Sequence, residues 1–246
     1  MDNKQAYIVS KLKGFLIDNY TPEMIILYGS TARGDNDEFS DIDIMVIMDV
    51  EDEGKVSAEI LADTEYIVHE KHIMLRSVDD FYNQRDIPGT MVYSALSEGQ
   101  VLFLRPGFNT DHRPVKSYEE RKKGVIKKEY LAQAHEFLEK GKIALDKRRF
   151  FRCRDFLRFA AVRALKAVMV FRDVHPPRGT DPGELFEKAL ELNPQIKKLQ
   201  PLINELNDFC PEGSDPGEII KCRGLIKKVK YFIDNVAYFI KGINCK

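Results

Sequence analysis

The sequence predicts an α+β protein in which a domain with a mixed sheet and helices precedes an all-α helical bundle. Short apolar runs that suit buried strands occur only before residue 105, whereas segments after residue 117 place apolar residues at helical spacing. The charge changes at the same place, because residues 1–115 carry 10 Lys and Arg against 21 Asp and Glu, and the remainder carries 28 against 18. We therefore expect domains over 1–108 and 117–246, joined by a turn-rich linker over 109–116.

The first domain is expected to alternate between helices and strands. An apolar stripe at helical spacing predicts an amphipathic helix over residues 5–19. Runs rich in β-branched and large apolar residues predict four strands, over 24–28, 44–48, 66–75 and 100–104. Further helices are expected over 55–63 and 88–96. Another helix is expected to begin near residue 80, with Asp79 or Asp80 as its cap.

The segment between the first two strands has a pattern that suits phosphate and metal binding. Gly29 permits a tight turn, and Ser30 is expected to cap the helical turn of residues 31–33, whose free N–H groups suit phosphate. Asp41 and Asp43 stand two residues apart at the start of the next strand, so both carboxylates project on one face. Two neighbouring carboxylates repel, and Mg²⁺ or Mn²⁺ is the cation that we expect between them. The alternative is an ordinary turn beside an exposed strand edge.

This pattern resembles the signature of the DNA polymerase β-like nucleotidyltransferase superfamily, which is Gly-Ser and, after a short loop, Asp-x-Asp. The residues that match it are Gly29, Ser30, Asp41 and Asp43. The longer wording GSTARG and SDIDI resembles the minimal nucleotidyltransferases of bacteria and archaea, and the phrase Ser97–Phe103 resembles the end of that domain. The resemblance implies a catalytic and metal-binding role for both aspartates, and nucleotide binding by the glycine, the serine and Arg33.

Two details of the resemblance stay open on the sequence alone. Arg33 either contacts phosphate or braces its loop through a salt bridge with Asp35 or Asp37. The family also implies a third carboxylate on the third strand, which accepts the proton of the attacking hydroxyl or helps to bind a metal. We assign this catalytic role to Glu70.

The alternative to Glu70 is that His72 or Met74 occupies the acidic position of the family. His72 can itself serve as a base, since the reference pKa of an imidazole lies near neutrality. It is otherwise only a strand residue at a polar position.

The second half is expected to form helices over 117–146, 150–172, 183–193, 195–209 and 216–242, with the second of these buried at the centre. The arrangement resembles HEPN domains, but it lacks an Arg and a His at the spacing that HEPN ribonucleases use. Its many basic residues form either a solvated face or a phosphate-binding surface. The most concentrated run contains Lys147, Arg148, Arg149, Arg152, Arg154 and Arg158.

Taken together, these features predict an Mg²⁺-dependent nucleotidyltransferase that moves a nucleoside monophosphate, with AMP favoured, from a nucleoside triphosphate to a hydroxyl of a protein or small molecule. The layout resembles that of kanamycin-type nucleotidyltransferases. The alternatives are a catalytically weak nucleotide-binding regulatory module and an RNA-binding HEPN protein. A homodimer is compatible with the sequence, and nucleic acid is a less favoured partner. Charged residues within positions 1–20 and the lack of a long apolar run predict a cytoplasmic protein without a membrane partner.

Overall fold

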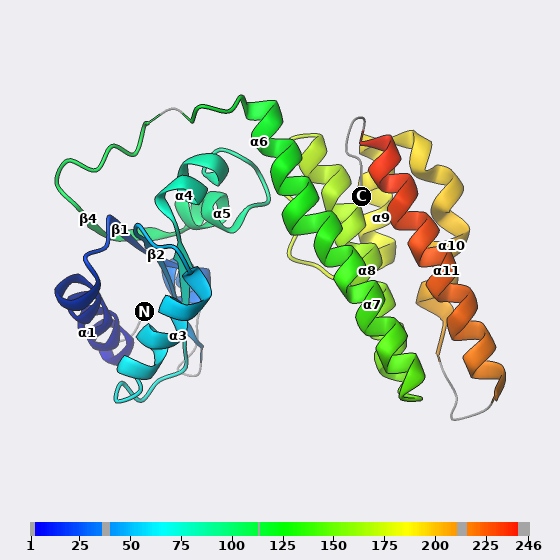
Figure 1. The fold of residues 1–246 in the computed structure, drawn as a ribbon, viewed down its shortest axis with the longest axis horizontal. Helices are drawn as coiled ribbons and strands as arrows, with labels where there is room; N and C mark the ends of the chain where they lie inside the picture. The colour runs from blue at the N-terminus through cyan, green and yellow to red at the C-terminus, as the bar shows by residue number, and fades with distance from the viewer. Residues whose placement is uncertain (1–2, 36–39, 113, 211–215, 241–246) are drawn as a thin grey trace. The chain divides into compact units, whose positions relative to one another are not determined.

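The computed structural model describes residues 3–35, 40–112, 114–210 and 216–240. The chain forms two compact units that divide between Ser117 and Tyr118. The first unit holds the sheet, and the described part of the second is helical, so the predicted α+β class is confirmed (Figure 1). Within the described ranges, no helix is both long and apolar enough to cross a membrane.

The first unit is built on a four-stranded mixed sheet with the strand order β3-β2-β1-β4. β1 pairs antiparallel with β2 and β4, and β2 pairs parallel with β3. The elements are α1 (Asn3–Tyr20), β1 (Met24–Tyr28), α2 (Gly29–Arg33), β2 (Ile42–Ile47), α3 (Glu53–Asp63), β3 (Lys71–Arg76), α4 (Val78–Gln84), α5 (Met91–Glu98) and β4 (Gln100–Leu104). The predicted strands at 24–28 and 100–104 are confirmed.

Each face of the sheet has its own apolar core, because successive strand residues point to opposite sides. On one face, Leu12 of α1 and Ile60 of α3 belong to the same buried cluster as Ile44 of β2. On the other face, Phe81 of α4 is clustered with Met45 of β2. The strands at the centre are therefore fixed from both sides, and the loop that leaves β1 starts from a rigid base.

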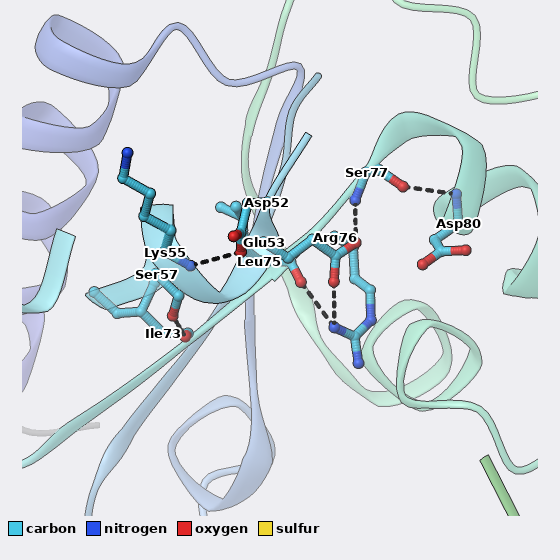
Figure 2. A network of polar contacts seen from close by, with 9 residues as sticks. All are labelled: Asp52, Glu53, Lys55, Ser57, Ile73, Leu75, Arg76, Ser77 and Asp80. Atoms are coloured by element: carbon cyan, nitrogen blue, oxygen red, sulfur yellow. Dashed lines mark hydrogen bonds and ion pairs between the residues drawn. The ribbon is translucent and has the colours of Figure 1, made fainter. Parts of the chain in front are cut away.

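Strand β3 lies at the edge of the sheet and is tied to both of its neighbouring helices by polar contacts. Glu53, at the start of α3, accepts hydrogen bonds from Arg76 Nη1 at 3.0 Å and from the main-chain N of Ser77 at 2.8 Å (Figure 2). The Ser77 hydroxyl then caps α4 by accepting from the main-chain N of Asp80. One carboxylate thus joins the start of α3 to the turn between β3 and α4.

Side chains of Ser57 and Arg76 occupy carbonyl groups on the outer edge of β3. Ser57 Oγ donates to the Ile73 carbonyl, and Arg76 Nη1 donates to the Leu75 carbonyl, both at 2.8 Å (Figure 2). Unpaired edge carbonyls are a template for another strand. These two contacts therefore oppose strand addition at this edge.

Three predictions about local boundaries were wrong. The third strand begins at Lys71 rather than at residue 66, because the chain after α3 makes turns in which the Ile67 N donates to Thr64 O and His69 N donates to Ile67 O. Helix α4 is capped by Ser77 rather than by Asp79 or Asp80. Helix α5 begins at Met91 rather than at residue 88, since Thr90 supplies its cap.

The described part of the second unit is a helical bundle around α8, which packs against α7, α9 and α11. Residues such as Leu157 and Leu165 of α8 are fully buried, so the predicted central helix is confirmed. The elements are α6 (Tyr118–Val125), η1 (Ile126–Leu131), α7 (Ala132–Asp146), α8 (Phe150–Phe171), α9 (Pro182–Leu192), η2 (Pro194–Leu199), α10 (Gln200–Asp208) and α11 (Pro216–Phe239).

Candidate active site

The two parts of the predicted motif meet where β1 ends and β2 begins. Tyr28, the last residue of β1, lies opposite Asp43 in the antiparallel register. Gly29 follows with φ +76°, and a Cβ atom on it would stand 2.1 Å from Asp43 Oδ2. No larger residue fits there, because the space that a side chain needs is filled by the carboxylate. The Asp43 carboxylate therefore lies directly against the predicted phosphate loop.

Asp43 is the more buried of the two aspartates. Its side chain is 24% exposed, whereas Asp41 lies exposed just before β2. Burial raises the pKa of the Asp43 carboxyl, and the negative charge of Asp41 raises it further, while His72 and Arg33 lower it. Burial and the nearby Asp43 carboxylate also raise the pKa of Tyr28 to about 12. The site thus holds more negative charge than its surroundings stabilise.

The approach to Asp41 is fixed by two side chains. Thr31 Oγ1, in α2, donates to the main-chain O of Asp41 at 3.1 Å. His69 Nε2 lies 3.2 Å from the main-chain O of Ser40, just before it. These contacts hold the start of β2 to the loop on one side and to the β3 approach on the other.

Ser30 does not cap a helix, which corrects the prediction. It lies inside α2, whose cap position is Tyr28 and has no side-chain cap bond. The main-chain O of Ser30 accepts from the N–H of Gly34 at 3.0 Å and closes the turn. Ser30 keeps its place beside Gly29, so its role as a nucleotide contact stays a prediction that rests on position.

Arg33 braces the loop. Its Nε lies 3.1 Å from Asp35 Oδ2, and its Nη1 lies 3.3 Å from Glu98 Oε2 at the end of α5. The pairing with Asp35 is one of the two that the sequence suggested, and Asp37 lies outside the described residues. The pairing with Glu98 was missed, although Glu98 falls within the phrase Ser97–Phe103 that had been singled out.

Gly99 explains why Glu98 can reach Arg33. A Cβ atom on Gly99 would stand 2.6 Å from the Leu27 carbonyl of β1 and 2.3 Å from the Ala95 carbonyl. Only glycine allows α5 to end this close to the central strand. The end of α5 is thereby placed next to α2.

His72, rather than Glu70, lies alongside Asp43. In the parallel register Asp43 is paired with His72, and Met45 with Met74, and the His72 Nδ1 stands 3.7 Å from Asp43 Oδ1. Glu70 precedes the strand and is exposed, and its main-chain O accepts from Ile42 N at 3.1 Å. The catalytic role of Glu70 stays a prediction. The signal for His72 was the strand alternation, which places residues 70, 72 and 74 on one face.

Asp41 and Asp43 supply carboxylate oxygens of the kind that divalent metals such as Mg²⁺ prefer. The negative charge of Asp41 acts on Asp43, and a cation would relieve the repulsion between them. Across the ranges that the structure describes, no group of three or more His, Cys, Asp and Glu side chains is arranged to hold a metal ion.

A known protein family matches most of the first unit. Residues 10–106 match the family model described as Polymerase beta, Nucleotidyltransferase. Over these residues the first unit is therefore similar to nucleotidyltransferase domains of the polymerase β type. No curated protein matches the chain.

Two solved structures are similar to the whole chain at low identity. One is a nucleotidyltransferase-like protein from Exiguobacterium sibiricum, with 12% identity and a TM-score of 0.45, covering 98% of this chain and 77% of that one. The other is the spectinomycin adenyltransferase AAD(9) from Enterococcus faecialis, solved with ATP and spectinomycin, with 11% identity and a TM-score of 0.44, covering 92% of this chain and 99% of that one.

Replacing Gly29 by alanine tests the contact with Asp43. The substitution Gly29→Ala adds a methyl group that collides with the carboxylate, in a backbone conformation that alanine rarely adopts. We expect a loss of about 2–3 kcal/mol in the free energy of unfolding, measured by urea denaturation. Gly34→Ala is the matched control, because Gly34 has φ +79° but no atom within 4 Å of a Cβ, so only the backbone strain of about 1–2 kcal/mol applies. Equal losses in the two variants would contradict the contact.

Asp43→Asn tests whether the ionised Asp43 carboxylate lowers the free energy of unfolding. Because the pKa of Asp43 is raised in the folded protein, the folded state binds the proton more tightly than the unfolded state does. The stabilisation from this tighter proton binding is complete below the ordinary carboxyl pKa. It is lost as the pH rises through the raised pKa of Asp43. In EDTA we therefore expect the asparagine variant to be more stable than the wild type at neutral pH, with the difference shrinking towards acid pH.

Urea denaturation across a pH series measures this difference. Glu65→Gln is the control, since Glu65 is an exposed acid in the turn after α3. A difference for Asp43→Asn that does not change with pH would show that the charge of Asp43 is not its cause.

Proposed function

We propose that the first unit transfers a nucleoside monophosphate, with AMP as the first candidate, from a nucleoside triphosphate to a hydroxyl group of a small molecule or protein. The observation that supports this most strongly is the Asp43 carboxylate lying against Gly29. A phosphate that contacts the loop of Gly29 and Ser30 would be next to both aspartates. Phosphate and carboxylates repel, so this arrangement calls for a divalent cation between them.

In this proposal Asp41 and Asp43 hold Mg²⁺ or Mn²⁺, which when bound neutralises phosphate oxygens and helps to align the reactants. The main chain of Gly29 and Ser30 orients the phosphates. Arg33 is proposed to contribute through its bridge to Glu98, which fixes the loop and leaves its positive charge near Asp43. Holding reactants in line in this way lowers the entropic part of the barrier.

The reaction forms a bond between the acceptor oxygen and the α-phosphorus and breaks the bond to the leaving pyrophosphate. The acceptor hydroxyl must lose its proton, and two side chains are candidates to take it. His72 lies beside Asp43, and Glu70 is two residues earlier on the same strand approach. We favour His72 because of its position in the strand register.

One observation favours a second candidate function. The side chain alongside Asp43 on β3 is an imidazole, where the resemblance implied a carboxylate. A nucleotide-binding module with little turnover would fit that difference. We also propose that residues 117–246 form a HEPN-like domain and that this domain selects the acceptor. A homodimer is a further part of the proposal.

Removing either aspartate should abolish transfer. For Asp41→Asn and Asp43→Asn we expect pyrophosphate release to fall by about 10²-fold or more, because the phosphate charge is no longer neutralised. The assay supplies Mg²⁺, each labelled nucleoside triphosphate and a panel of hydroxyl acceptors. Asp79→Asn is the control, since Asp79 is exposed. It lies in α4, after the end of β3 that is farther along the chain from His72. Metal-dependent triphosphate binding without turnover would support the second candidate, and no binding at all would contradict both.

Separate substitutions at His72 and Glu70 identify the proton acceptor. We expect His72→Gln to lower the rate constant of transfer by about 10²-fold, with little change in triphosphate affinity. Glu70→Gln is expected to have a small effect. The reverse order of effects would assign the role to Glu70 and contradict our preference for His72.

A further inference from the structure

The turn between α7 and α8, in the second unit, surrounds a small pocket with positive charge. The pocket has a volume of about 240 Å³. Four of its lining side chains are cationic and two are large and apolar. They are Lys140, Lys147, Arg149 and Arg152, together with Ile143 and Phe156.

Most of these cations have no acidic partner. In the described part of the chain, Lys147, Arg149 and Arg152 form no ion pair, whereas Lys140 is paired with Glu136 at 2.6 Å. Asp155, a nearby acid of α8, is bound by Arg154 at 2.8 Å. Asp146, just before Lys147, is exposed and makes no ion pair in these ranges. Like charges around one pocket repel, and an anionic ligand would relieve this repulsion.

The basic side chains are not needed to form the turn. The main chain closes it, because Arg148 N donates to Leu145 O and Arg149 N donates to Ala144 O, both at 2.8 Å. Helix α8 then begins at Phe150 with no acidic residue in its first turn and no side-chain cap. The positive end of the helix adds to the positive charge of the arginines. A purely structural role therefore does not explain this cluster.

The pocket also has an apolar wall. Phe156 stacks with Phe137 at a ring-centroid distance of 6.3 Å, and Ile143 is 54% exposed. The cations gather around this one concavity. Proteins that bind single-stranded nucleic acid instead use a long groove that follows the extended backbone. The ligand indicated by this shape is a compact polyanion.

We propose that this pocket binds a polyphosphate group, such as the phosphate chain of a nucleoside triphosphate or inorganic tripolyphosphate. Arginine and lysine donate charge-assisted hydrogen bonds to phosphate oxygens, and arginine can do so through two nitrogen atoms. The site is built entirely from residues of the second unit. It does not require the aspartates of the first unit or a metal ion.

Isothermal titration calorimetry with tripolyphosphate, on the full chain in EDTA at low salt, tests this proposal. We expect binding to be weakened at least tenfold in the variant Lys147→Gln/Arg149→Gln/Arg152→Gln and to be weakened by added salt. Lys188→Gln/Arg223→Gln/Lys227→Gln is the matched control, because it removes three exposed charges of the same unit that form no ion pair in the described ranges. Asp41→Asn/Asp43→Asn should bind tripolyphosphate like the wild type. This separates the pocket from the proposed transfer site.

Three results would overturn the proposal. They are no binding of tripolyphosphate by the wild type, equal weakening in both triple variants, and loss of binding in the Asp41→Asn/Asp43→Asn protein. A single-stranded oligonucleotide serves as a further probe. If it binds through the three pocket residues while tripolyphosphate and ATP do not, the ligand is a nucleic acid and the proposal is wrong. Circular dichroism of every variant checks that the helical content is retained.

Discussion

The contact between the Asp43 carboxylate and Gly29 is the constraint on which the first unit depends. A half-buried carboxylate placed beside a second aspartate is unfavourable for the folded protein by itself, because burial and like charge both oppose ionisation. It is maintained because β1 and β2 are fixed by apolar cores on both faces of the sheet. The stability of the sheet thus supports an arrangement that, in the function we propose, is useful only when phosphate and a cation are present.

Strand β3 shows how an edge strand is positioned without a second neighbouring strand. Its outer carbonyls are occupied by Ser57 and Arg76, and Glu53 ties the end of the strand to α3 and α4. These contacts fix the outer edge and the end of β3, and its parallel pairing with β2 gives its register. The same register brings the His72 imidazole next to Asp43. A polar network at one end of the strand therefore supports the position of a candidate catalytic group at the other end.

In the second unit, helix α8 has a buried apolar face and exposed basic residues. The buried face of α8, with residues such as Leu157, is almost entirely apolar, and basic residues such as Arg149 and Arg152 lie exposed at its start. Because main-chain hydrogen bonds close the turn before α8, the side chains of Lys147 and Arg149 are free of a structural task. Positive charge that is not used for folding is more informative about binding than charge that is paired within a helix.

The sequence by itself determined the elements that depend on local patterns. The strand at Met24–Tyr28 and the turn at Gly29 follow from an apolar run and a glycine, both of which act over a few residues. It did not determine the start of β3 or the cap of α2, because turn hydrogen bonds overrode weak local preferences. Only the tertiary structure placed His72 beside Asp43 and Glu98 beside Arg33. Those contacts depend on strand register and on how closely α5 approaches β1, which are set by packing between residues far apart in the chain.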